Sequence, residues 1–68
     1  MTMKNSVKVQ RAIANITQAQ LAEKIGVSRQ TINAIEAGKY VPSTVLALKI
    51  AKLFDKSVND IFELESTD

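Results

Sequence analysis

Apolar residues recur three or four positions apart along most of the chain, which is the spacing of amphipathic helices. Two short helices of this kind are expected over residues 18–25 and 29–36, joined by a very short turn. A connection this tight predicts that the two helices cross each other. Their apolar faces are formed by Leu21, Ala22, Ile25, Ile32 and Ile35.

Capping residues mark the ends of both helices. Thr17 is a good N-cap, and Gln20 follows three residues later in a variant of the capping box. Gly26 can adopt the left-handed conformation that ends a helix, and Ser28 caps the next one. The small side chain of Ala22 allows a close crossing. These features predict a helix-turn-helix unit, which presents its second helix to the DNA major groove, rather than an ordinary helical hairpin in a bundle.

Three further helices are expected around this unit. The first covers residues 5–14 and ends at Asn15, which tolerates a left-handed backbone. The fourth covers residues 44–54 and the fifth residues 58–62, after which the alternation in residues 63–65 suits a strand. The fourth helix is expected to supply most of the core through Val45, Leu46, Leu48, Ile50, Ala51, Leu53 and Phe54.

Composition limits the chemistry of the chain. Its 68 residues allow one domain with a small core, and they include no cysteine and no histidine. The commonest nucleophilic, acid-base and metal-binding groups are therefore missing, so we expect neither an enzyme nor a metal or cofactor site. The sequence has no secretory signal and no apolar run long enough to span a membrane, which predicts a soluble, cytoplasmic protein.

The net charge of +2 conceals a strong asymmetry. Residues 1–54 carry a net charge of +6, whereas residues 55–68 carry −4. A basic body with an acidic end suits a surface that meets phosphates on one side only. The alternative, scattered surface lysines without such a role, stays open for Lys49, Lys52 and Lys56.

The run TQAQLAEKIGVSRQTINAIEAGKYVPS resembles the helix-turn-helix family of lambdoid phage repressors and Cro proteins, also called the xenobiotic-response-element family. The similarity is greatest to its small lone-domain members. It implies an all-α, compact five-helix, lambda-repressor-like DNA-binding domain. It further implies a short antiparallel ribbon formed by residues 1–4 and 62–65.

Polar residues of the second helix of the motif are candidates for reading bases. With Ile32 and Ile35 turned inward, Arg29, Gln30 and Asn33 point away from the core. Arginine pairs with guanine, and glutamine or asparagine with adenine, although these residues could also be merely solvated. The resemblance places Arg29 and Gln30 at base-contacting positions. It places Ala34 at the next one, where only a thymine methyl could be touched.

A second set of residues is expected to contact the DNA backbone, because free N–H groups at helix starts favour anions. This set comprises Thr17, Gln18, Thr31, Lys39 and Tyr40. The resemblance supports Gln18, which is also expected to brace Gln30, and the loop with Lys39 and Tyr40. Tyr40 could instead cover the core above Pro42.

The resemblance also implies a structural ion pair between Arg11 and Glu36, tying the first helix to the third. On the first helix, Val9 and Ile13 form an apolar stripe four residues apart, on a face that is solvated in relatives. We favour the interpretation that this helix packs with a slightly rotated face. The other interpretation is a patch that binds a partner.

The apolar C-terminal end is expected to form a homodimer, as the resemblance implies. Phe62 and Leu64 should stay partly exposed in a lone monomer, beside an already closed core. The predicted interface comprises Phe54, Val58, Ile61, Phe62 and Leu64. Two linked recognition helices would then bind a palindromic or pseudo-palindromic operator in double-stranded DNA.

The sequence therefore predicts a sequence-specific dimeric regulator of transcription. A repressor is favoured because no separate effector domain is evident. The alternative is an antitoxin, or a phage or plasmid control protein, that binds an antagonist or toxin protein as well as its own operator.

Overall fold

The computed structural model describes residues 3–65 and contains five helices and one two-stranded sheet. In chain order they are β1 (Met3–Asn5), α1 (Val7–Ala14), α2 (Gln18–Ile25), α3 (Arg29–Glu36), α4 (Thr44–Leu53), α5 (Val58–Ile61) and β2 (Phe62–Leu64). The predicted five-helix fold with a terminal ribbon is confirmed. Residues 1–2 of the expected ribbon and the C-terminal residues 66–68 lie outside the described part.

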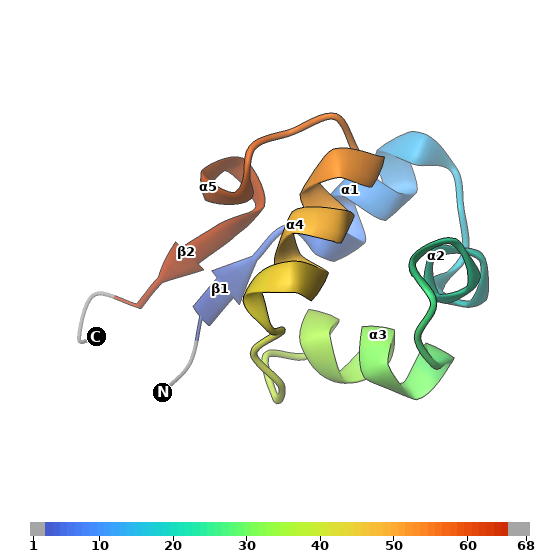
Figure 1. Ribbon diagram of the computed structural model, residues 1–68, viewed down its shortest axis with the longest axis horizontal. Coiled ribbons are helices and arrows are strands. Elements are labelled where there is room, and N and C mark those ends of the chain that lie inside the picture. Colours follow the sequence, from blue (N-terminus) through green and yellow to red (C-terminus); the bar gives the residue numbers. More distant parts are fainter. Residues whose placement is uncertain (1–2, 66–68) are drawn as a thin grey trace.

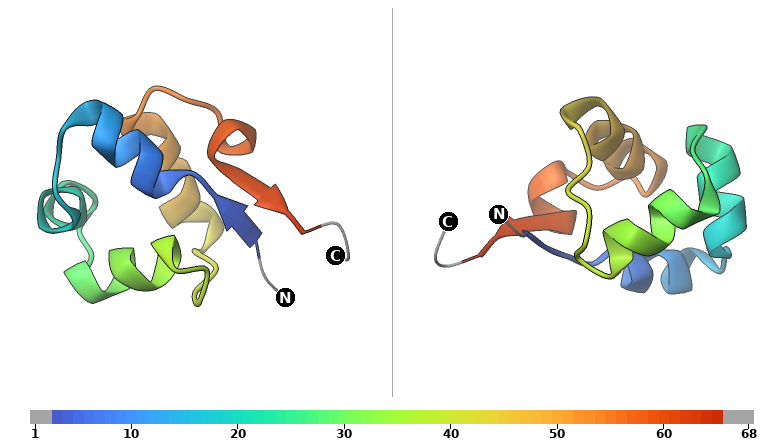
Figure 2. Two further views of the ribbon diagram at one scale, coloured as in Figure 1. Left: turned by 180° about the vertical axis from the view of Figure 1, so that it is seen from behind. Right: turned by 90° about the horizontal axis from the view of Figure 1, so that it is seen from below.

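The helices surround one apolar core (Figure 1). In Figure 1, α4 lies in front of α1, α3 lies below them, and α2 lies at the end of the molecule opposite the ribbon; Figure 2 shows the same arrangement from behind and below. The core contains Val7, Leu21, Ala22, Ile25, Ile32, Ile35, Leu46, Ala47, Ile50, Ala51, Ile61 and Phe62. None of the helices in residues 3–65 has the length and apolar character needed to cross a membrane.

Hydrogen bonds at the helix ends explain the observed boundaries of α2 and α3. The Thr17 hydroxyl accepts the backbone N–H of Gln20 at 3.0 Å, and the Gln20 side chain accepts the N–H of Thr17 at 2.8 Å. Gly26 ends α2 with a left-handed φ of 77°, and Asn15 ends α1 in the same way with a φ of 58°. The Ser28 hydroxyl accepts the N–H of Thr31 at the start of α3. The predicted bounds of both helices are confirmed.

The fourth helix buries only one side. Leu46, Ala47, Ile50 and Ala51 are in the core, whereas Val45 is 64% exposed and Leu48 54% exposed. The expectation that Val45, Leu48 and Leu53 belong to the core is therefore wrong. A domain with five short helices has too few neighbours to cover α4 on every side.

The apolar stripe on α1 is also exposed, because α1 packs through Val7 and its opposite side faces solvent. Val9 is 56% and Ile13 74% exposed. The favoured interpretation, in which α1 turns this stripe inward, is wrong. The stripe is a surface feature of the folded chain.

The ribbon pairs the two ends of the described chain. Met3 lies opposite Leu64, Lys4 opposite Glu63, and Asn5 opposite Phe62. This pairing brings Phe62 into the core, where it is 6% exposed, next to Ile61 at 2%. The expectation that Phe62 stays exposed in a monomer is wrong, whereas Leu64 is 58% exposed as expected.

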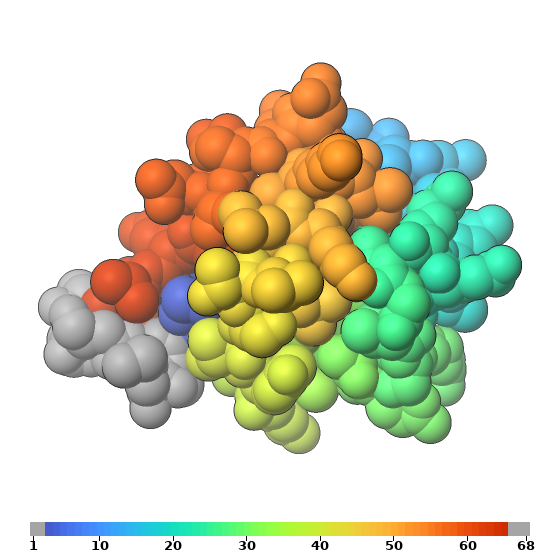
Figure 3. Space-filling model, in the orientation of Figure 1, coloured from blue at the N-terminus to red at the C-terminus, as the bar shows by residue number. Residues whose placement is uncertain are grey.

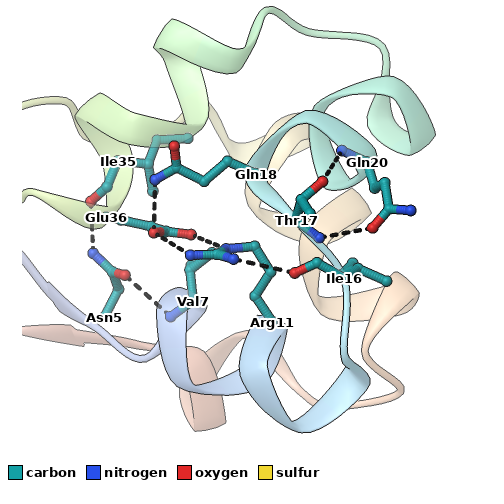
Figure 4. A network of polar contacts seen from close by, with 9 residues as sticks. All are labelled: Asn5, Val7, Arg11, Ile16, Thr17, Gln18, Gln20, Ile35 and Glu36. Carbon is teal, nitrogen blue, oxygen red and sulfur yellow. Dashed lines mark hydrogen bonds and ion pairs between the residues drawn. The ribbon is translucent and has the colours of Figure 1, made fainter.

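A polar network at the junction of α1, α2 and α3 fixes the position of α3 (Figure 4). The carboxylate of Glu36 accepts hydrogen bonds from Arg11 Nε at 2.7 Å and from a second Arg11 nitrogen at 3.1 Å. The Gln18 side chain donates to the same carboxylate at 3.1 Å, and Arg11 also donates to the carbonyl of Ile16. The helix α3 is thereby tied to α1 by a bidentate, charge-assisted contact, and to α2 by the single bond from Gln18.

A neighbouring contact joins the ribbon to the end of α3. The Asn5 side chain donates to the carbonyl of Ile35 at 2.8 Å and accepts the N–H of Val7 at 3.1 Å. One carboxamide thus caps the start of α1 and also binds the carbonyl of Ile35, which accepts the N–H of Gly38 as well.

The network also changes the protonation of Glu36, whose side chain is only 6% exposed. Burial by itself raises the pKa of Glu36. Hydrogen bonds from Arg11 and Gln18, together with the charges of Arg11 and Lys8, outweigh burial and hold that pKa below its ordinary value of 4.5. The carboxylate is therefore ionised and paired at neutral pH.

Replacing Glu36 with alanine should lower the free energy of unfolding by about 2–3 kcal/mol, because Arg11 would remain largely buried without its partner. Urea denaturation measures the change. Glu23→Ala removes an exposed carboxylate and serves as the control, with little expected effect. A loss for Glu36→Ala no larger than that of Glu23→Ala would show that the pair is dispensable.

The lowered pKa of Glu36 also predicts how stability depends on pH. The unfolded chain takes up this proton at a higher pH than the folded one, so the contribution is complete above pH 4.5 and is lost as the pH falls through the folded pKa. Asp60 adds to the same decline, since hydrogen bonds from Ser57 lower its pKa. The contributions of Glu36 and Asp60 are separated by measuring the free energy of unfolding of wild type and Glu36→Gln as a function of pH. The variant should lose less stability between neutral and acidic pH, and equal losses would contradict the account.

Candidate nucleic-acid interface

The exposed side of α3 gathers the predicted base-reading residues around one hollow of about 230 Å³, here called the reading hollow. Arg29, Gln30 and Asn33 are exposed, and Ala34 forms part of the floor between them. The hollow is lined by Arg29, Gln30, Asn33, Ala34 and Lys39. Every predicted base contact therefore lies on one surface, together with one predicted backbone contact.

A second hollow, of about 650 Å³, lies at the start of α2 and is here called the α2-start hollow. Thr17, Gln18 and Ala19 line it together with Arg29, so that this arginine borders both hollows. The backbone N–H groups of Gln18 and Ala19 have no hydrogen-bond partner within residues 3–65. Free N–H groups at a helix start, beside an arginine, favour an anion such as phosphate.

Two of the predicted backbone contacts are partly occupied within the protein. The N–H of Thr17 is donated to Gln20, so only the hydroxyl hydrogen of Thr17 could reach a phosphate. Gln18 donates to Glu36, whereas it was expected to brace Gln30. That expectation is wrong, because the side chain of Gln18 turns toward the α1–α3 junction (Figure 4).

The remaining backbone candidates differ in how accessible they are. The hydroxyl of Thr31 lies 2.9 Å from that of Ser28, which leaves it less free to reach DNA. Lys39 is exposed, and its backbone N–H is fixed on the carbonyl of Ala34. Tyr40 is 46% exposed and lies outside the core, which disfavours its interpretation as a cover over Pro42.

Four residues that line the α2-start hollow escaped the sequence analysis, namely Ala12, Asn15, Ile16 and Ala19. Asn15 and Ala19 both line the α2-start hollow, close to Arg29. Ala19 is a small residue in the first turn of α2, and that position could have pointed to its free N–H. Asn15 was not considered for this surface, because its left-handed backbone already explained its presence at the end of α1.

The electrostatics of the two hollows suit a polyanion. Neither hollow is lined by an acidic residue, and both contain arginine. Glu36 lies at the end of α3, but Arg11 compensates its charge. Within residues 3–65 no cluster of three or more acidic, histidine or cysteine side chains could hold a metal ion.

A third hollow lies at the other end of the molecule, between the ribbon, α4 and α5. It has a volume of about 420 Å³ and is here called the ribbon groove. In Figure 3 it falls where the blue atoms of β1 meet the red atoms of β2 and the yellow atoms of α4. Its lining is mainly apolar and comprises Met3, Pro42, Thr44, Ala47, Leu48, Val58, Asn59, Phe62 and Leu64. Of the predicted dimer residues, Val58, Phe62 and Leu64 line this groove, whereas Phe54 and Ile61 do not.

Transcriptional regulators known from sequence are similar to the chain over nearly its whole length. An uncharacterized HTH-type transcriptional regulator of Methanocaldococcus jannaschii is 58% identical over 66 residues, which cover 97% of this chain and all of the relative. The cryptic phage CTXphi transcriptional repressor RstR of Vibrio cholerae is 32% identical and covers 100% of this chain, which spans 61% of the repressor.

Solved structures agree with the sequence relatives. The solution structure of the SOS-response transcriptional repressor LexA from Eubacterium rectale superposes with a TM-score of 0.80 at 27% identity. The match covers 93% of this chain and 67% of that one. The helix-turn-helix family matches residues 7–61, from the start of α1 to the end of α5. The chain therefore belongs to the helix-turn-helix family of DNA-binding transcriptional regulators that includes phage repressors.

Proposed function

We propose that the protein is a sequence-specific transcriptional repressor that reads the DNA major groove with α3. The observation that carries this proposal is the reading hollow, in which Arg29, Gln30 and Asn33 project together from one helix. These side chains have the donor and acceptor groups that distinguish guanine and adenine in the major groove. Names of two relatives, the phage repressor RstR and LexA, favour repression over activation.

The dimensions and neighbours of α3 support this mode of binding. Its eight residues correspond to a helix about 12 Å long, similar to the width of the major groove. The free N–H groups at the start of α2 lie next to Arg29, where they would hold a phosphate while α3 meets the bases. Lys39 would contact the backbone at the other side of the reading hollow.

The protein would act as a homodimer through the ribbon groove. Leu48 and Leu64 line this groove and are more than half exposed, although they are large apolar side chains. A two-fold copy seated there would bury them and join two reading helices at a fixed separation. Two half-sites about one helical turn apart, roughly 34 Å, would then form a palindromic operator. This proposed interface differs from the one expected from the sequence, because it includes Leu48 of α4 and omits Phe54 and Ile61.

A second candidate function is that of a control protein or antitoxin that also binds another protein. The exposed stripe of Val9 and Ile13 favours it, because this stripe lies outside all three hollows described above. An antagonist or toxin seated on α1 would then regulate operator binding.

Arg29→Ala and Gln30→Ala should each weaken binding to a duplex selected by the wild-type protein by about 1–3 kcal/mol. On unrelated duplexes Gln30→Ala should have little effect, and Arg29→Ala a smaller loss than on the selected duplex, because Arg29 also borders the α2-start hollow. Lys39→Ala should weaken both equally and reduce the slope of log affinity against log salt by about one. Fluorescence anisotropy at several salt concentrations measures these changes, with Lys56→Ala as the control. Equal losses on both kinds of duplex for Arg29→Ala and Gln30→Ala would mean that these residues contact phosphates only.

The double variant Leu48→Glu, Leu64→Glu should be a folded monomer with greatly weakened operator binding, because both positions are exposed in the single chain. Ile13→Glu places the same charge on another exposed apolar residue and should remain a dimer. Sedimentation equilibrium and circular dichroism report mass and folding. A monomeric wild type, or dissociation caused by Ile13→Glu alone, would refute an interface at the ribbon groove.

A further inference from the structure

A fourth hollow lies between the C-terminal ends of α2 and α4, with a volume of about 700 Å³, and is here called the α2–α4 groove. It opens on the face shown in Figure 3, between the orange atoms of α4 and the green atoms of α2. Its apolar part is formed by Ile25, which is 6% exposed, and Leu53, which is 37% exposed. A large apolar side chain could therefore enter the groove and contact both residues.

Three lysines surround this apolar part. Lys24, Lys49 and Lys52 line the groove and are exposed, against a single acidic residue, Glu23. Within residues 3–65 the only ion pair is that of Arg11 and Glu36, so none of the three lysines has a carboxylate partner there. The groove thus combines uncompensated positive charge with an apolar part in which Leu53 is accessible and Ile25 is nearly buried.

The helix dipoles explain the positions of two of these lysines but not of the third. Lys24 and Lys52 lie in the last turns of α2 and α4, where a cation offsets the negative helix end. Lys49 lies one turn earlier, on the same side of α4 as Lys52, where it only adds to the repulsion between like charges. A ligand with negative charge would relieve that repulsion.

The groove is separate from the surfaces assigned to DNA and to the dimer. It shares no lining residue with the reading hollow, the α2-start hollow or the ribbon groove. It receives no residue from α3. A ligand could therefore occupy it while both other surfaces are in use.

We propose that the α2–α4 groove binds an acidic segment of a partner protein, with an apolar side chain against Ile25 and Leu53 and carboxylates at Lys49 and Lys52. The inference does not depend on the proposed repressor function. It adds a partner-binding site that would remain open in a DNA-bound dimer.

The probe is a ten-residue peptide in which leucine alternates with aspartate and glutamate, titrated into isotope-labelled protein and followed by NMR. The expected chemical-shift changes are confined to residues 23–26 and 49–53. Lys49→Glu together with Lys52→Glu should weaken binding about tenfold, from the loss of two attractive charge pairs. Lys4→Glu with Lys56→Glu changes the net charge equally at two exposed positions outside the groove and should leave the affinity close to that of wild type.

Three kinds of result would overturn the proposal. The first is equal affinity for a peptide with serine in place of leucine, which would mean that binding depends on charge alone and not on the apolar part of the groove. The second is a set of shifts spread over all lysines, or an equal loss in both double variants. The third is a change in the chemical shifts of residues 23–26 and 49–53 when an unrelated DNA duplex is added. This would indicate that the lysines of the groove contact DNA. Operator binding by the Lys49→Glu, Lys52→Glu variant tests the repressor function separately.

Discussion

The carboxylate of Glu36 is the point at which the DNA-binding unit is held together. It accepts hydrogen bonds from Arg11 on α1 and Gln18 on α2 while itself belonging to α3. Arg11 further binds the carbonyl of Ile16, just before α2 begins. Because the Arg11–Glu36 contact is bidentate and Gln18 shares the same carboxylate, these contacts restrain three helices at one point. The position of Arg29, which borders both the reading hollow and the α2-start hollow, depends on that arrangement.

The same pair explains how an acidic residue can lie at the end of the helix proposed to enter DNA. An unpaired carboxylate there would repel phosphates, whereas Glu36 is compensated by Arg11 and held ionised by its hydrogen bonds. The free N–H groups at the start of α2 then provide the local field that favours an anion. Structural and electrostatic roles are thus combined in one contact, which ties folding to the proposed function.

The bounds of the helices could be predicted from contacts between residues that are close in the sequence. Which apolar side chains stay exposed could not, because that depends on how many other elements pack around each helix. Thr17, Gly26 and Ser28 act through contacts within a few residues, so their capping roles could be predicted from sequence. Val45 and Leu48 look like core residues in any single helix, and only the three-dimensional packing shows that no other part of residues 3–65 covers them. Phe62 escaped prediction for the opposite reason, since pairing with Asn5 across the ribbon carries it into the core.

The most direct test of the account is selection of duplexes from a random DNA pool, followed by sequencing of those the protein retains. A reading surface built on α3 and doubled by a two-fold axis predicts two inverted half-sites with centres about one helical turn apart. Enrichment of a single unrepeated half-site would contradict the dimer. A retained pool with no enriched sequence at all would contradict the central claim that the protein reads DNA bases.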